Sequence, residues 1–264
     1  MMYLSCLTID AGESGSDRTI GSRWLQNRYR VHQRLCMAFP RESRLIADPD
    51  FLAPLVPEDF PLLRPEASLS IAMVGVQRLT HVHAARSSDA GFLFRIDSRC
   101  HSSQIIVQSA TAPNWLYAFA NFRGVLLEEP KVRPFAPAFS RGQRVQFRLE
   151  ANPTRCIDSK SAPDGTRRRG RRVPVPAAGC VEWLRRFGLT SGFSLHPQDV
   201  SLDFGPVRVR KGADAQGGIT YFAARFDGLI TIDDPEAFVK KLSSGFGAAK
   251  SYGFGLMSVT APQA

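Results

Sequence analysis

The chain lacks the features that mark several large protein classes. Its five cysteines are an odd number, lie far apart and form no C-x-x-C pair, which argues against a disulfide framework or a zinc cluster. No window approaches 18 uninterrupted apolar residues, so we expect no membrane-spanning helix. The first residues, MMYLSCLTID, contain no basic segment followed by a long apolar run. We therefore expect no signal peptide and a cytoplasmic location.

The chain also lacks a nucleotide-binding or metal-binding motif. Its glycine-rich stretch at 243–255, SSGFGAAKSYGFG, departs from the P-loop pattern because Ser244 stands where the first glycine belongs. It departs from G-x-G-x-x-G because position 250 is lysine. His81 and His83 have no third ligand nearby, which favours solvated side chains over a metal site. No acidic cluster resembles a two-metal nuclease site, so we expect no metal and no cofactor.

The composition indicates a folded chain with a polyanionic partner. The sequence has 264 residues, enough for two small domains, and is 44% hydrophobic, so it can bury a core. Its 34 lysines and arginines exceed its 24 acidic residues, which gives a formal net charge of +10. An excess of this size favours nucleic acid or an acidic membrane surface as the partner, although many proteins are basic for no specific reason.

Hydrophobic periodicity predicts one helix and four strands in the first half of the chain. The strands are expected at 3–9, 92–97, 104–110 and, as a proline-containing edge strand, 132–139. The helix is expected at 24–39, ended by Pro40. The segment 41–90 contains five prolines and reads as an insertion or long loop. This order fits a ferredoxin-like fold, and we place the first domain at 1–139.

The second half of the chain predicts a similar order of strands and helices. Strands are expected at 143–151, 199–204, 206–211, 221–232 and 256–259, and helices at 178–187 and 233–242. Asp234 is the expected N-cap of the last helix, with Pro235 in its first turn. We therefore predict an α+β protein of two tandem ferredoxin-like (RRM-like) domains, each an antiparallel sheet with helices on one face. The second domain is placed at 140–264.

The predicted helix at 24–39 carries a histidine and a tyrosine on the same side. His32 lies roughly 80° from the centre of the helix's apolar stripe, and Tyr29 lies just beyond it. Three arginines surround this pair: Arg28, Arg30 and Arg34. An imidazole beside a phenol at the rim of a core is suited to proton transfer facing an anion. The alternative is that His32 and Tyr29 only cover the edge of an amphipathic helix and have no catalytic role.

Half of the chain's net positive charge lies between 155 and 172, in RCIDSKSAPDGTRRRGRR. Two aspartates stand there against seven basic residues: Arg155, Lys160, Arg167, Arg168, Arg169, Arg171 and Arg172. Strand-like segments flank the stretch, and Asp164-Gly165 is typical of a hairpin turn. A basic β-hairpin can bind phosphates and reach base edges with arginine, whereas a solvated basic loop is the alternative.

The glycine-rich stretch offers a second contact for phosphate. Gly245, Gly247 and Gly253 leave backbone amides open to close approach, and Lys250 adds charge beside Ser251. Metal-free cleavage of a nucleic acid requires RNA, because its 2′-hydroxyl is a built-in nucleophile. The histidine and tyrosine of the helix would then move protons, while Lys250 or a local arginine supplies positive charge.

Nine stretches of the chain match one family in the same order. They are YLSCLTI, NRYRVHQRL, FLFRID, IIVQS with a following Pro-x-Trp, FRLEANPT, RRVPV, VEWLRR, FDGLITIDDP and SGFGAAKSYGFGLMSV. Together they resemble the CasE family, the CRISPR repeat-processing endoribonucleases of type I-E Cascade. The match covers nearly the whole chain apart from about 41–90, and its ordered succession is more specific than any one motif.

The resemblance implies two tandem ferredoxin-like domains and metal-independent cleavage of precursor CRISPR RNA within its repeat stem-loops. It implies a 2′,3′-cyclic phosphate product and an enzyme that stays on the processed hairpin as a Cascade subunit, beside the backbone subunits. By motif, His32 matches the family's catalytic histidine and Tyr29 its neighbouring tyrosine. The basic hairpin around Arg155 and Arg167–Arg172 matches the element that holds the stem, and Gly245–Gly255 matches the family's loop near the RNA.

The resemblance leaves several points open. Some family members carry a lysine or arginine soon after the histidine, where this chain has Gln33 and Met37, with Arg34 the nearest cation. The third catalytic group is therefore open, as are the role of 41–90 and which of the histidine and tyrosine is acid or base. Two other functions remain compatible with the residues: a non-catalytic module that binds RNA hairpins, and a generic basic scaffold.

Overall fold

The computed structural model describes seven segments of the chain: 2–12, 19–39, 91–98, 102–119, 122–157, 171–210 and 218–261. The predictions for 41–90, including His81 and His83, lie outside these residues. The chain forms two compact units. Unit 1 contains Met1–Ala136, Arg208–Ile219 and Ser251–Gly253, and unit 2 contains Pro137–Val207, Thr220–Lys250 and Phe254–Ala264. The predicted boundary between 139 and 140 stays a prediction.

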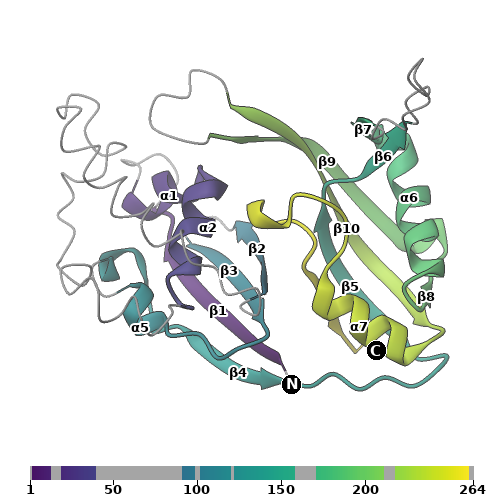
Figure 1. Ribbon diagram of the computed structural model, residues 1–264, viewed down its shortest axis with the longest axis horizontal. Helices are drawn as coiled ribbons and strands as arrows, with labels where there is room; N and C mark the ends of the chain where they lie inside the picture. Colours follow the sequence, from purple (N-terminus) through teal and green to yellow (C-terminus); the bar gives the residue numbers. More distant parts are fainter. Residues whose placement is uncertain are drawn as a thin grey trace, which may run out of the picture. The chain divides into compact units, whose positions relative to one another are not determined.

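Unit 1 is built on a four-stranded antiparallel sheet (Figure 1). Its elements are β1 (Met2–Asp10), α1 (Ile20–Leu25), α2 (Arg28–Cys36), β2 (Phe92–Ser98), β3 (Ser102–Ser109), α5 (Trp115–Ala118), η3 (Arg123–Val125) and β4 (Lys131–Phe135). The strand order is β2-β3-β1-β4, so β3 separates β1 from β2. This is the split βαβ arrangement of ferredoxin-like folds. In the register, Ile105 pairs with Leu7 on one side and Ile96 on the other.

The helix predicted at 24–39 is two short helices, because two capping residues divide the segment. The Thr19 side chain accepts a hydrogen bond from the Ser22 amide and begins α1, and the Asn27 side chain accepts from the Tyr29 amide and begins α2. A capping side chain satisfies an amide that has no partner inside the helix, so each favours a start. The prediction of one continuous helix was therefore wrong.

The core of unit 1 follows the alternation of the strands. Leu7 and Ile9 of β1 are fully buried, and they join Val31 and Leu35 of α2 and Phe94 of β2 in one cluster. Because successive strand residues point to opposite faces, this alternation places the helices on one side of the sheet.

The second half of the chain repeats the arrangement with a two-stranded insertion. Its elements are β5 (Arg144–Ala151), β6 (Thr154–Ile157), β7 (Arg171–Pro174), α6 (Ala177–Leu189), β8 (Phe193–Ser194), η4 (Pro197–Asp199), β9 (Val200–Val209), β10 (Ile219–Ile232), α7 (Pro235–Ser244), η5 (Lys250–Tyr252) and β11 (Met257–Thr260). The sheet order is β11-β5-β10-β8, with β9 also paired to β10. One strand, β9, replaces the two predicted at 199–204 and 206–211. β6 and β7 form a separate antiparallel pair.

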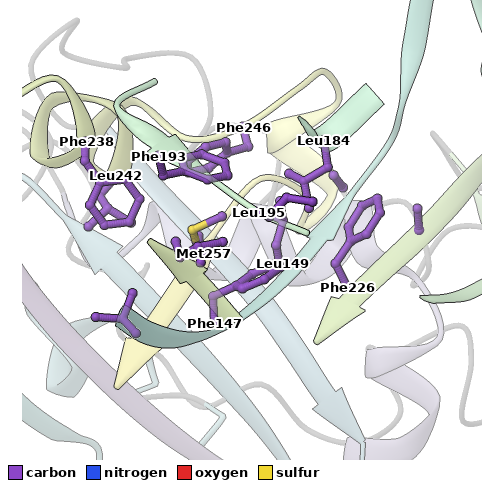
Figure 2. Packing of buried hydrophobic residues seen from close by; sticks show 14 of the residues in the cluster. Phe147, Leu149, Leu184, Phe193, Leu195, Phe226, Phe238, Leu242, Phe246 and Met257 are labelled. Carbon is purple, nitrogen blue, oxygen red and sulfur yellow. The ribbon is translucent and has the colours of Figure 1, made fainter. Parts of the chain in front are cut away.

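The core of unit 2 lies between its sheet and its helices (Figure 2). Leu149 of β5 is opposite Phe226 of β10 and Met257 of β11, which sets the three strands in register. Leu184 of α6 and Phe238 of α7 pack into the same cluster and are fully buried. The predicted fold class, tandem ferredoxin-like α+β, is confirmed. None of the described helices is long and apolar enough to cross a membrane.

The predicted N-cap of α7 provides a test of this local structure. The Asp234 carboxylate accepts hydrogen bonds from the amides of Glu236 and Ala237, both at 3.1 Å. We expect Asp234→Ala to lower the free energy of unfolding by about 1 kcal/mol, because both amides lose their acceptor. Urea denaturation measures the change. Asp234→Asn is the matched control and should stay close to the parent; equal loss in both variants would contradict the capping role.

Candidate active site

The predicted catalytic residues share one side of α2. Arg28, His32 and Cys36 follow one another at i, i+4 and i+8, and Tyr29 lies three residues before His32. Residues three and four apart are neighbours on a helix surface, so the four side chains form one row. Tyr29 is half-buried, and the Cys36 sulfur lies 3.7 Å from His32 Nε2.

The imidazole of His32 is more deeply buried than a position on the rim of the core predicts, with 5% of its surface exposed. Phenylalanine rings from β2 cover it. The Phe92 ring centroid lies 5.4 Å from that of His32, and the Phe94 ring is nearly parallel to it at 6.1 Å and 16°. These two residues lie far along the chain from α2, so helical periodicity in α2 does not reveal them. The imidazole is therefore shielded from bulk water.

Part of the glycine-rich stretch belongs to unit 1 and lies against α2. Arg28 Nη1 donates a hydrogen bond to the Tyr252 carbonyl at 3.2 Å, and the rings of Tyr29 and Tyr252 are 6.4 Å apart. The next residue, Gly253, has a φ of +80°, and a Cβ there would lie 2.9 Å from the Phe94 ring. Both the backbone angle and the space require glycine at this position. The structure thus brings Gly253, Tyr29 and His32 together.

Arg34, predicted to contact RNA, is placed elsewhere. It is 1% exposed, and its Nη1 donates to the Ala118 carbonyl at 2.9 Å. Its guanidinium carbon lies 4.9 Å from the centre of the Phe122 ring. Burial lowers the pKa of Arg34 to about 9, so the side chain keeps its charge at neutral pH. A side chain enclosed in this way supports the core. Arg34 is therefore no longer a candidate for contact with RNA phosphates.

Arg28 is the site residue that sequence reasoning missed. It was recognised only as one of three arginines around His32, yet it stands four residues before His32 and is fixed to the glycine-rich stretch by its bond to Tyr252. The i, i+4 spacing is the signal that singles it out. Arg30 is partly buried, and burial lowers its pKa. Arg28 is therefore the arginine of the three that lines the row.

The ends of the predicted basic hairpin are two paired strands in unit 2. Cys156 is opposite Arg172 and Ile157 is opposite Arg171, and the side chains of Arg155, Arg171 and Arg172 are exposed. Four further predicted contacts, Lys160, Arg167, Arg168 and Arg169, lie outside the described residues. The antiparallel pairing confirms the strands of the hairpin, while the RNA contacts of its arginines stay a prediction.

The rest of the glycine-rich stretch lies in unit 2, apart from Ser251, which is half-buried in unit 1. Gly245 and Gly247 have φ angles of +76° and +74°. The Lys250 ammonium donates to the Ser244 carbonyl at the end of α7, and burial lowers its pKa. The lysine thus stabilises a helix C-terminus, which is a structural use of its charge.

The described residues contain no group of three or more His, Cys, Asp or Glu side chains arranged to hold a metal ion. The row on α2 offers acid–base groups. His32 and Tyr29 are titratable side chains in a nearly dry setting, where electrostatic interactions are stronger than in water. Arg28 supplies a positive charge next to them. This arrangement can move protons and stabilise an anion at one place.

Comparisons with known proteins agree on one family. A model of the family described as CRISPR associated protein matches residues 76–261. CRISPR-associated endoribonuclease Cse3 of Thermus thermophilus is 32% identical over 167 residues, which cover 59% of this chain and 72% of that protein. CRISPR system Cascade subunit CasE of Escherichia coli strain K12 is 28% identical over 195 residues, covering 69% and 88%.

Solved structures show the same fold. Thermus thermophilus Cse3, bound to an RNA representing a pre-cleavage complex, superposes with a TM-score of 0.63 at 25% identity, covering 98% of each chain. The crystal structure of Cas6e from Escherichia coli K-12 gives a TM-score of 0.56 at 21% identity, covering 98% of this chain and all of that one.

The burial of Arg34 leads to a test of its structural role. We expect Arg34→Ala to lower the free energy of unfolding by about 2–4 kcal/mol, because it leaves a cavity and an unsatisfied Ala118 carbonyl. Arg34→Met fills most of the space and should lose less. Chemical denaturation measures both, with Arg133→Ala on the exposed strand β4 as the control. An Arg34→Ala protein as stable as the parent would show that the side chain does not support the core.

Proposed function

This chain belongs to the CRISPR associated protein family and is a CasE (Cse3) member of it, and we propose that it cleaves precursor CRISPR RNA within repeat stem-loops. The observation that carries the proposal is the row on α2, with Tyr29 beside Tyr252, and with His32 and Gly253 both against the Phe94 ring. A histidine and a phenol beside an arginine are the groups that a metal-independent cut in RNA requires.

In the proposed reaction the RNA provides its own nucleophile. The 2′-oxygen loses its proton and attacks the adjacent phosphorus, while the bond from phosphorus to the 5′-oxygen breaks. The 5′-oxygen takes up a proton, and the products are a 2′,3′-cyclic phosphate and a 5′-hydroxyl. His32 and Tyr29 are the proton-transfer groups. The Arg28 guanidinium stabilises the negative charge that develops on the phosphate oxygens.

The proposal assigns RNA binding to unit 2. Exposed Arg155, Arg171 and Arg172 on β6 and β7 bind phosphates of the stem, together with the arginines between the two strands. The name of the Escherichia coli relative, Cascade subunit CasE, supports a place for this protein in Cascade. The proposal adds that after the cut the protein stays on the processed hairpin, beside the backbone subunits. We place this assembly in the cytoplasm.

A hairpin-binding protein without chemistry is the second candidate. The observation that favours it is the burial of His32, since a ring with 5% of its surface exposed leaves little room for a phosphodiester. The two candidates share every binding residue and differ only in whether the row on α2 reacts. Incubation of the protein with a repeat hairpin in EDTA separates them, because only the enzyme yields two fragments.

Replacing the imidazole tests the catalytic assignment. We expect His32→Ala to reduce single-turnover cleavage about 1,000-fold, on the order of losing one proton-transfer group. Hairpin affinity should change less than about threefold, because the phosphate contacts lie on other residues. Gel analysis of labelled RNA measures the rate, and filter binding measures the affinity. Loss of both together would mean that His32 is structural.

The RNA supplies the matched control for this experiment. A single 2′-deoxy substitution at the scissile nucleotide removes the nucleophile and leaves the protein unchanged. The parent protein should bind this RNA with unchanged affinity and leave it intact, with or without EDTA. Cleavage of the deoxy substrate would contradict attack by the 2′-hydroxyl.

Neutralising the described arginines of the hairpin tests the binding assignment. The double variant Arg171→Ala/Arg172→Ala should bind the stem more weakly and with a smaller salt dependence. Each lost phosphate contact lowers the slope of log K against log salt concentration by about 0.7–0.9, because one counterion fewer is released. Affinities measured over roughly 50–200 mM KCl give the slope. Arg133→Ala is the control, and an unchanged slope in the double variant would remove these residues from the interface.

A further inference from the structure

A pocket is lined by residues of α6 and β6. Figure 1 shows α6 next to the paired strands β6 and β7. Its volume is about 360 Å³, which lies within the range of ligand sites in proteins. Arg155 contributes from β6, Val175 from the turn after β7, and the other lining residues come from α6: Gly179, Glu182, Trp183, Arg186, Phe187 and the following Thr190. All of these residues belong to unit 2. The active-site row on α2 does not include them.

The pocket contains an aromatic surface that is held in place. The Trp183 ring lies 5.0 Å from the Phe187 ring and is nearly parallel to the buried Phe226 ring, at 6.3 Å and 16°. Trp183 is half-buried, whereas Trp24 and Trp115 are buried in the core of unit 1 with 3% and 4% of their surfaces exposed. A fixed, accessible indole offers a flat face for stacking at little cost in side-chain entropy.

The charge around the pocket favours a polyanion. Arg155 and Arg186 line it, and the Lys241 ammonium lies 4.7 Å from the centre of the Phe187 ring. Glu182 is the single acid among the lining residues. It accepts hydrogen bonds from Arg185 and Arg186 at 2.6–2.9 Å, and these bonds lower its pKa to about 2. Two arginines balance this one carboxylate, so it leaves no net negative charge to repel a phosphate.

We propose that this pocket binds one unpaired nucleotide next to the stem of the repeat RNA, with its base stacked on Trp183. Arg155 and Arg186 bind the phosphate that joins this nucleotide to the stem. The inference rests on the proposed function, because it takes repeat RNA as the ligand. Arg155 links the pocket to the proposed stem-binding hairpin, because its strand, β6, leads directly into the basic segment assigned to the stem. A base inside the stem is already stacked and paired, so the nucleotide that enters comes from the loop or from a flank.

The residue types of the pocket match those of known single-strand sites. Proteins that bind unpaired nucleic acid combine a basic groove with aromatic rings on which bases stack. A partner protein is a less suitable occupant, because Arg155 and Arg186 line a small apolar surface and Lys241 adds a third positive charge beside Phe187. Stacking requires no particular base, so we expect the pocket to accept any base and to lose affinity when the base is missing.

Intrinsic fluorescence provides a direct test, because Trp183 is the one tryptophan of the three that is not buried in a core. The test uses the full-length His32→Ala variant, which keeps the RNA intact. Addition of a repeat hairpin with its natural flanks should quench the emission, and Trp183→Phe in the same background should remove most of the quenching. Trp183→Ala should weaken affinity about 5- to 100-fold, as the loss of one base–aromatic stack does. Leu189→Ala, at an exposed position of the same helix, is the matched control.

The RNA is varied as well, so that the result does not depend on the folding of a variant. A series of hairpins carries one abasic nucleotide at each unpaired position of loop and flanks. One position should lose affinity with the parent residue at 183 and lose nothing further with Trp183→Ala. Equal binding across the whole series, or quenching that survives Trp183→Phe, overturns the proposal.

Two further outcomes are distinguishable from these. If neither the His32→Ala protein nor the parent protein with the uncleavable 2′-deoxy hairpin binds RNA, the proposed function fails; equal binding across the abasic series instead overturns the pocket alone. If Trp183→Ala binds every RNA normally but no longer assembles with the other Cascade subunits, the pocket holds a protein segment and the nucleotide assignment is wrong.

Discussion

The close approach between Gly253 and the Phe94 ring is the constraint on which the candidate active site depends. A Cβ at position 253 would lie 2.9 Å from that ring, and the backbone there has a positive φ, so only glycine lets the stretch reach β2. Phe94 also contacts His32, whose ring lies nearly parallel to it. One aromatic side chain therefore fixes both the imidazole and the glycine-rich stretch. Tyr252, the preceding residue, then meets Tyr29 and Arg28.

Burial assigns different roles to arginines that look alike in the sequence. Arg28 and Arg34 flank His32 on the same helix, yet one reaches the Tyr252 carbonyl and the other is enclosed against Ala118 and Phe122. A guanidinium that is 1% exposed cannot exchange its partners for a phosphate without opening the core. Arg28 keeps its place in the row with His32 and Tyr29. Some family members have a lysine or arginine soon after the histidine, which this chain lacks. Arg28, one helical turn before His32, is the candidate for that third catalytic group.

Apolar runs and period-two alternation located most strands of the two sheets, because each sheet buries one face: Leu7 and Ile9 in β1, and Phe147 and Leu149 in β5, are buried. The short β8 was not predicted, and β9 was predicted as two strands. The break between α1 and α2 was missed, because the apolar stripe used to predict the helix continues across Asn27, which caps α2. The depth of His32 was not predictable from α2 alone. It depends on β2, which follows the 41–90 segment, and local periodicity carries no information about contacts at that distance in the chain. The prediction of His32 and Tyr29 as proton-transfer groups rests on motif and spacing, which do not depend on where the helix begins, and it stays a prediction.

The two ferredoxin-like repeats place their functional residues at the same point of the fold. In unit 1 the connection from β1 leads into α1 and α2, which carry His32, Tyr29 and Arg28. In unit 2 the connection from β5 contains β6 and β7 and leads into α6, where Arg155 and Trp183 line one pocket. The first strand and the following helix are held by the sheet in both cases, so the segment between them can vary without loss of the core. In the proposed function the two repeats have different tasks: the first provides proton transfer, and the second provides cations and an aromatic face for RNA. In such an arrangement the residues that bind RNA differ from those that cleave it, so binding does not depend on catalysis. A nuclease that remains bound to its product requires this separation.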